Sequence, residues 1–122
     1  MTKSQIKELD KLLREAVFAR DKYKCRKCGR TDTLAPAHLY PKGRYRRLRW
    51  TPENILTLCW NCHLNWAHKN PIEFKEWLDE ELGKEAMDKL KLMSNYNDSS
   101  PMDYNAIKLY LKTLTDLREK YA

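Results

Sequence analysis

The chain has 122 residues, of which 42% are hydrophobic and 34% charged, and its formal net charge is +7. This length fits one domain, residues 1–122, and excludes a large enzyme with separate cofactor and substrate domains. No apolar run could span a bilayer, and the first residues are charged where a signal peptide is apolar, so we expect a globular, cytoplasmic protein without a membrane partner.

The first predicted element is an N-terminal helix over residues 1–21. Thr2 and Gln5 fit a capping box at its start, and Asp21 stands near its end. Apolar residues recur at spacings of three and four, which is typical of an amphipathic helix. These residues are Ile6, Leu9, Leu12, Leu13, Ala16 and Val17.

Residues 22–70 form the predicted core of the domain. Glycine and proline break this stretch into short pieces, and we expect two strands, 34–40 and 55–58, followed by a short helix over 60–69. Three tryptophans are expected to pack between helices. They are Trp60, Trp66 and Trp77.

A helical extension over residues 71–122 completes the prediction. Expected helices cover 71–82 and 84–94, and a last helix begins near Pro101 after the polar linker 95–100. The predicted fold class is therefore α+β, with a small ββα centre between N-terminal and C-terminal helices. The last helix has one apolar stripe, formed by Ile107, Tyr110, Leu111, Leu114, Leu117 and Tyr121.

All four cysteines fall in two CxxC pairs, Cys25 with Cys28 and Cys59 with Cys62. Two such pairs place four thiolates for tetrahedral coordination of one zinc ion. Unrelated core cysteines and a redox CxxC are the alternatives, but a redox site needs only one pair and usually a thioredoxin-like pattern, which is absent. The pattern predicts a structural Zn²⁺ with no open position, which stabilises the fold and does no chemistry.

The three histidines lie inside or just after the loop that this zinc site would close. His38 follows the first predicted strand, Asn54 precedes the second, and His63 directly follows Cys62. This order resembles the HNH nuclease family, the ββα-metal endonucleases, in its zinc-knuckle branch with phage-type, NinG/Rap-like members. The resemblance covers about residues 16–83. Its matching segments are 37–38, 49–54, 58–63 and 70–78.

The resemblance implies an endonuclease that hydrolyses DNA phosphodiester bonds and leaves 5′-phosphate and 3′-hydroxyl ends. His38 would be the general base that activates water, and Asn54 would orient His38 through a side-chain contact. His63 would bind one divalent ion, such as Mg²⁺, Mn²⁺ or Ni²⁺, which neutralises the scissile phosphate and the departing 3′ oxygen. The alternatives are a turn or core histidine at His38 and a polar residue beside the zinc at His63.

Ala37 departs from the family pattern, in which His or Asp often precedes the base as a second metal ligand. His68 is the obvious substitute. On an ideal α-helix five residues turn through about 500°, so His63 and His68 would lie about 140° apart and could share an ion only where the helix bends or ends. The alternative for His68 is a helix C-terminal histidine favoured by the macrodipole.

Positive charge is concentrated in residues 21–50, which carry ten basic and two acidic side chains. Between His38 and Asn54 lies a basic loop with no acidic residue nearby in the sequence to pair with it. Because arginine binds phosphate oxygens bidentately, we expect this loop to contact DNA, and a solvated charge run is the alternative. The cationic residues of the basic loop are Lys42, Arg44, Arg46, Arg47 and Arg49.

The expected function is a metal-dependent HNH DNA endonuclease, phage-encoded and acting in the host cytoplasm. One rival is a zinc-knuckle DNA-binding protein without catalysis, which Ala37 favours. A second rival is a packaging or recombination accessory protein whose acidic C-terminal helices bind a protein partner. The basic loop favours the nuclease and the DNA-binding protein over the accessory protein, because only the first two need a surface for a polyanion.

Overall fold

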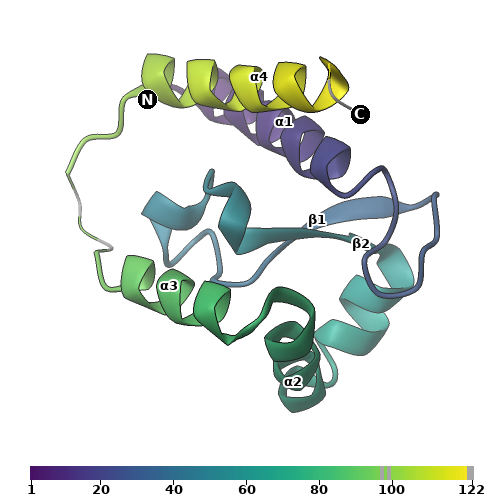
Figure 1. Ribbon diagram of the computed structural model, residues 1–122. Coiled ribbons are helices and arrows are strands. Elements are labelled where there is room, and N and C mark those ends of the chain that lie inside the picture. Colours follow the sequence, from purple (N-terminus) through teal and green to yellow (C-terminus); the bar gives the residue numbers. More distant parts are fainter. Residues whose placement is uncertain (97, 99, 121–122) are drawn as a thin grey trace.

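Two helical layers enclose a two-stranded sheet in the computed structural model, which describes residues 1–96, 98 and 100–120 (Figure 1). Helices α1 (Lys3–Arg20) and α4 (Tyr104–Lys120) lie on one side of the sheet, and α2 (Pro71–Leu82) and α3 (Lys84–Ser94) lie on the other. The predicted α+β class is confirmed at this level. Within the described residues, no helix combines the length and apolar character needed to cross a bilayer.

Helix α1 begins and ends where the sequence predicts. The hydroxyl of Thr2 accepts the backbone N–H of Gln5 at 3.1 Å, and the Gln5 side chain accepts the N–H of Thr2 at 2.9 Å, which completes the capping box. Asp21 caps the other end. The apolar face is turned into the molecule, where the buried residues are Leu9, Leu13, Ala16 and Val17.

Helix α4 runs parallel to α1 and packs along it. An ion pair of 2.8 Å joins Lys108 to Glu8 near the starts of the two helices, and Arg118 donates to the carbonyl of Ala16 at 2.7 Å near their ends. Between the helices and the sheet lies one apolar cluster, which excludes water from this interface. Its buried members are Leu9, Leu13, Val17, Trp50, Ile55 and Leu111.

The apolar stripe expected on α4 is only partly buried. Tyr110 and Leu117 are each 48% exposed, although the stripe includes both, and Tyr121 lies outside the described residues. The stripe is wider than the line along which one helix can contact another, so one edge of it stays in solvent. The buried or half-buried members are Ile107, Leu111 and Leu114.

The sheet consists of β1 (Leu34–His38) and β2 (Ile55–Cys59), paired antiparallel. The register places His38, the last residue of β1, opposite Ile55, the first residue of β2. Every residue of β2 is buried, because α1 packs on the sheet and the segment after β2 folds back against it. The sheet therefore carries His38 at the end of a half-buried strand that is paired with a fully buried one.

The first strand is two residues shorter than the predicted 34–40. The backbone N–H and C=O of Tyr40 both bond the side chain of Asn54, which removes Tyr40 from strand pairing. The loop that follows contains two 3₁₀ turns, η1 (Arg46–Leu48) and η2 (Pro52–Asn54). A buried side chain therefore ends the strand, and the strand periodicity of the sequence gives no sign of it.

A π-helix, η3 (Asn61–Ala67), follows β2 where the sequence predicts an ordinary helix over 60–69. The N–H of His68 donates to the carbonyl of His63 at 3.2 Å, so the hydrogen bond spans five residues. Such turns are rare and are frequently found at functional sites. The predicted element exists, but its winding differs from the prediction.

Helices α2 and α3 are separated by Gly83, whose φ of 85° favours a residue without a Cβ. Aromatic rings join α2 to η3: the Trp66 ring lies 5.5 Å from that of Phe74 and 5.4 Å from that of Trp77. The expected packing of two tryptophans between helices is therefore correct. Trp60, expected to do the same, is 60% exposed, because it precedes η3 on the outer side of the turn.

Candidate functional site

Four cysteine thiols meet where the loop after α1 approaches the start of η3. Their sulfur atoms all lie within 4.8 Å of one another, and the sulfurs of Cys28 and Cys59 are 3.6 Å apart. Four sulfurs placed tetrahedrally at about 2.3 Å from zinc are about 3.8 Å apart, so this cluster fits the ion. The two CxxC pairs thus form one site that could bind a metal ion such as zinc. Cys28 is exposed, and the other three cysteines are buried.

Backbone hydrogen bonds shape the cysteine cluster. The N–H of Gly29 donates to the carbonyl of Cys25 at 2.8 Å, and the N–H of Cys25 donates to the carbonyl of Arg30 at 2.8 Å, which closes a tight turn around the first pair. In the second pair, the N–H of Cys62 lies 3.4 Å from the sulfur of Cys59. An N–H directed at sulfur stabilises the thiolate, which is the form that binds metal.

The thiols of the cluster differ in pKa: that of Cys25 is lowered and that of Cys62 is raised. Burial raises the pKa of Cys25, but backbone N–H groups of Cys28, Cys59 and Lys27 outweigh burial and lower it to about 7. Burial and the neighbouring thiols raise the pKa of Cys62. Four adjacent thiols therefore do not all ionise without a cation to hold them, as expected for a metal site.

His63 of η3 and His68, the residue that caps the C-terminal end of η3, lie side by side. Their ring centroids are 4.6 Å apart and the ring planes meet at 89°. The five-residue hydrogen bond of the π-turn brings the two rings together, whereas an α-helix would separate them by about 140°. Two imidazoles at this separation can turn their nitrogens toward one ion. Among the described residues, however, only the cysteines form a ready group of three or more ligands.

His38 is half-buried at the end of β1, and its Nε2 lies 3.0 Å from the carbonyl of Arg49. When Nε2 carries the proton and donates it there, Nδ1 is the nitrogen free to accept a proton. Burial lowers the pKa of His38. Burial, followed by the charges of His68 and His38, also lowers the pKa of His63. Both rings are therefore neutral near pH 7, the state that a base and a metal ligand require.

Asn54 is fully buried, and its side-chain hydrogen bonds go to the backbone of Tyr40 and Leu48 and not to the His38 ring, contrary to the expectation. Its Nδ2 donates to the carbonyls of Tyr40 at 3.0 Å and Leu48 at 3.1 Å, and its Oδ1 accepts the N–H of Tyr40 at 2.8 Å. These three bonds use the amide at both ends. Asn54 therefore holds the backbone of the basic loop. The hydrogen-bond partner of the His38 ring is the carbonyl oxygen of Arg49 instead.

The expectation that no acidic group pairs with the basic loop is wrong for Arg49. Asp10 of α1 accepts from the Nε and Nη2 of Arg49 at 3.0 and 2.7 Å, and also from the indole N–H of Trp50 at 2.9 Å. Asp10 lies 39 residues away in sequence, so the sequence pattern does not indicate this pairing. The guanidinium predicted to grip DNA is therefore occupied within the protein.

Arg46 and Arg47 also have partners inside the chain. Arg47 pairs with the Asp98 carboxylate at 2.9 Å, and both arginines donate to the carbonyl of Ser100, at 2.8 and 3.0 Å. Their side chains tie the basic loop to the linker before α4. Three cationic residues of the loop nevertheless lie at the surface, namely Lys42, Arg44 and Arg46.

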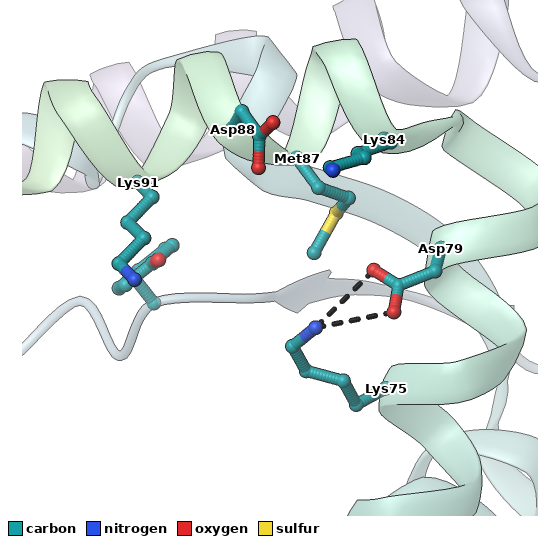
Figure 2. A pocket seen from close by; sticks show the side chains of 7 residues that line it. Lys75, Asp79, Lys84, Met87, Asp88 and Lys91 are labelled. Atoms are coloured by element: carbon teal, nitrogen blue, oxygen red, sulfur yellow. Dashed lines mark hydrogen bonds and ion pairs between the residues drawn. The ribbon is translucent and has the colours of Figure 1, made fainter.

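A pocket of about 330 Å³ lies between α2, α3 and Tyr40, two positions after His38. Figure 2 shows Lys84 and Lys91 extending into it from α3, while Lys75 is held by Asp79 at 3.2 Å. The sequence does not indicate this group of lysines, because residues 71–122 carry more acidic than basic side chains. Only the fold brings these lysines next to the end of β1.

No protein-family model matches the chain, and no curated protein or solved structure was found to match it. The function is therefore inferred from the side chains and their geometry.

Proposed function

We propose that this protein is a metal-dependent DNA endonuclease of the HNH type. The observation that carries the proposal is the π-turn of η3, which brings His63 and His68 to a centroid distance of 4.6 Å. This pair follows two antiparallel strands, and the first strand ends in His38. A strand pair followed by a metal-binding helix is the order of a ββα-metal site.

His38 acts as the general base in this proposal. Its ring is neutral at pH 7, its Nε2–H is held by the Arg49 carbonyl, and its Nδ1 accepts the proton of the attacking water. A positioned base of this kind contributes on the order of 10²–10⁴-fold to the rate. The residue therefore affects cleavage far more than DNA binding.

His63 and His68 hold the catalytic ion. Two imidazole ligands suit Ni²⁺ or Zn²⁺ better than Mg²⁺, because imidazole is a softer donor than carboxylate or water. When bound, a divalent ion polarises the phosphate and neutralises the departing oxygen. His68 thus supplies the second ligand that Ala37, which is buried and apolar, cannot provide.

The four cysteines hold a structural zinc ion. The site offers four thiolates and no open position, so it stabilises the turn that leads from β2 into η3 and takes no part in hydrolysis. DNA contacts come from the surface cations of the basic loop and from Lys84 and Lys91 beside Tyr40. The binding should accordingly weaken as salt rises.

The test is cleavage of plasmid and of branched and single-stranded DNA by the zinc-loaded protein, with Mg²⁺, Mn²⁺ or Ni²⁺. We expect cleavage by the wild type, loss of cleavage in His38→Ala, and unchanged cleavage in Asn65→Ala, an exposed change on η3 that serves as the control. Wild-type protein that binds DNA but cuts no form with any ion contradicts the proposal. The protein would then be a zinc-dependent DNA-binding protein. This second candidate is favoured by Ala37, which stands where the family pattern often has a metal ligand.

A further inference from the structure

We infer that Asp10, which lies on α1 outside the segment that resembles HNH nucleases, is a positioning residue for His38. Asp10 binds the guanidinium of Arg49, and the backbone carbonyl of the same residue bonds the His38 ring. The inference rests on the proposed role of His38 as the general base. It assigns a part of the site to a helix that the ββα centre does not contain.

Three donors converge on the Asp10 carboxylate. Arg49 donates twice, from Nε at 3.0 Å and Nη2 at 2.7 Å, and the Trp50 indole donates once at 2.9 Å. A planar guanidinium bound at two points is fixed in direction as well as distance. Because the side chains of consecutive residues are bonded to the same carboxylate, the peptide between Arg49 and Trp50 is restrained from both sides.

The segment before Arg49 is held independently. The Asn54 amide donates to the carbonyl of Leu48 at 3.1 Å, and the N–H of Arg49 donates to the carbonyl of Arg46 at 3.3 Å. Asn54 and Asp10 therefore anchor the backbone on the two sides of the carbonyl that accepts from His38. The ring direction is set by this pair of anchors and not by a direct side-chain contact.

The Asp10 carboxylate is ionised at neutral pH. Burial raises its pKa, but the bonds from Arg49 and Trp50 outweigh burial and lower it. Partly exposed ion pairs contribute little to overall stability, so the expected effect of Asp10 lies in the placement of the Arg49 carbonyl. A displacement of about 1 Å at a reacting group can cost on the order of 10²-fold in rate.

The experiment compares Asp10→Ala and Asp10→Asn with Glu8→Ala. Glu8 is on the same helix, forms a similarly exposed ion pair with Lys108 and lacks any bond to the basic loop in the described structure, so it controls for the removal of charge. The first readout is the His38 ring N–H in ¹H–¹⁵N spectra, which is protected from exchange while it is bonded to Arg49. The second is the cleavage rate at saturating DNA.

We expect Asp10→Ala to remove the protected His38 resonance and to lower the cleavage rate about 10- to 100-fold with unchanged KM for DNA. Asp10→Asn, which keeps one acceptor oxygen, should lie between Asp10→Ala and the wild type, and Glu8→Ala should match the wild type. If Asp10→Ala does not fold, Asp10→Asn and Arg49→Lys, which lacks the guanidinium fork, serve instead.

The spectroscopic result separates this inference from the proposed function. A resonance that disappears in Asp10→Ala and stays in Glu8→Ala supports the positioning role even if the wild type cuts no DNA. A resonance and a cleavage rate that are the same in Asp10→Ala as in Glu8→Ala overturn it. So does an equal loss of the resonance in both variants, because the effect would then be one of charge or general stability.

Discussion

Replacing His68 by alanine tests whether the π-turn builds a metal site. In the structure the His68 and His63 rings are 4.6 Å apart by their centroids, close enough for one nitrogen of each to reach an ion at about 2.1 Å. The substitution leaves His63 as the only ring of the pair. His68 is exposed and its side chain is not part of an apolar cluster, so the fold should survive the change.

The expected loss is large because one of two protein ligands disappears. Removal of groups that merely support a ligand costs about 10- to 100-fold in metal affinity, so loss of a ligand should cost at least about 100-fold, equivalent to about 2.7 kcal/mol. We therefore expect the Ni²⁺ concentration for half-maximal cleavage to rise by that factor in His68→Ala. His63→Ala should show a similar or larger rise.

The assay is a titration of cleavage with Ni²⁺ on zinc-loaded protein, paired with calorimetric binding of Ni²⁺ in the absence of DNA. Asn65→Ala, a change to another exposed residue of η3, is the control and should follow the wild type. A His68→Ala titration that overlies the wild-type curve while His63→Ala shifts it would refute the reasoning, because His63 would then bind the ion with some other companion.

Three further outcomes are expected. Cys59→Ser, or chelation of the zinc, should abolish the cooperative thermal transition of the centre seen by circular dichroism, because metal binding contributes to folding. Lys84→Ala with Lys91→Ala should lower the salt slope of DNA binding by about one for each phosphate that the variant no longer binds, whereas Lys89→Ala, outside that pocket, should leave it unchanged. Cleavage needs neutral His38, whose pKa burial lowers, so activity should fall only as pH drops below the usual histidine value of about 6.5; a midpoint above pH 7 would contradict this.

Features that depend on a few neighbouring residues were predictable from the sequence. The capping box of Thr2 and Gln5, the helix break at Gly83 and the two cysteine pairs each depend on a few adjacent positions, and each is present in the structure. Such signals act through local backbone geometry or through fixed ligand spacing, so distant parts of the chain do not alter them.

The partners of the basic loop and the winding of η3 were not predictable from the sequence. The partners of Arg49 and Arg47 lie 39 and 51 residues away, and no local pattern indicates either of them. The π-turn of η3 inserts one residue into a helical winding that has the same apolar periodicity as an α-helix over so short a length. Its effect on His63 and His68 therefore becomes visible only in three dimensions.

Arg49 and Arg47 of the basic loop differ in how easily a DNA phosphate could replace their partners within the protein. Arg49 is held at two points by a carboxylate that also binds Trp50, so exchanging this partner for a DNA phosphate would break both Arg49 bonds and leave Asp10 bonded only to Trp50 among these donors. Arg47 meets an exposed Asp98, and a surface pair of this kind is weak in water. A phosphate could replace Asp98 at Arg47 without disturbing the strands, whereas displacing Asp10 would release the side chain of the residue whose carbonyl bonds His38. Arg49 is therefore less suited than Arg47 to bind a DNA phosphate directly.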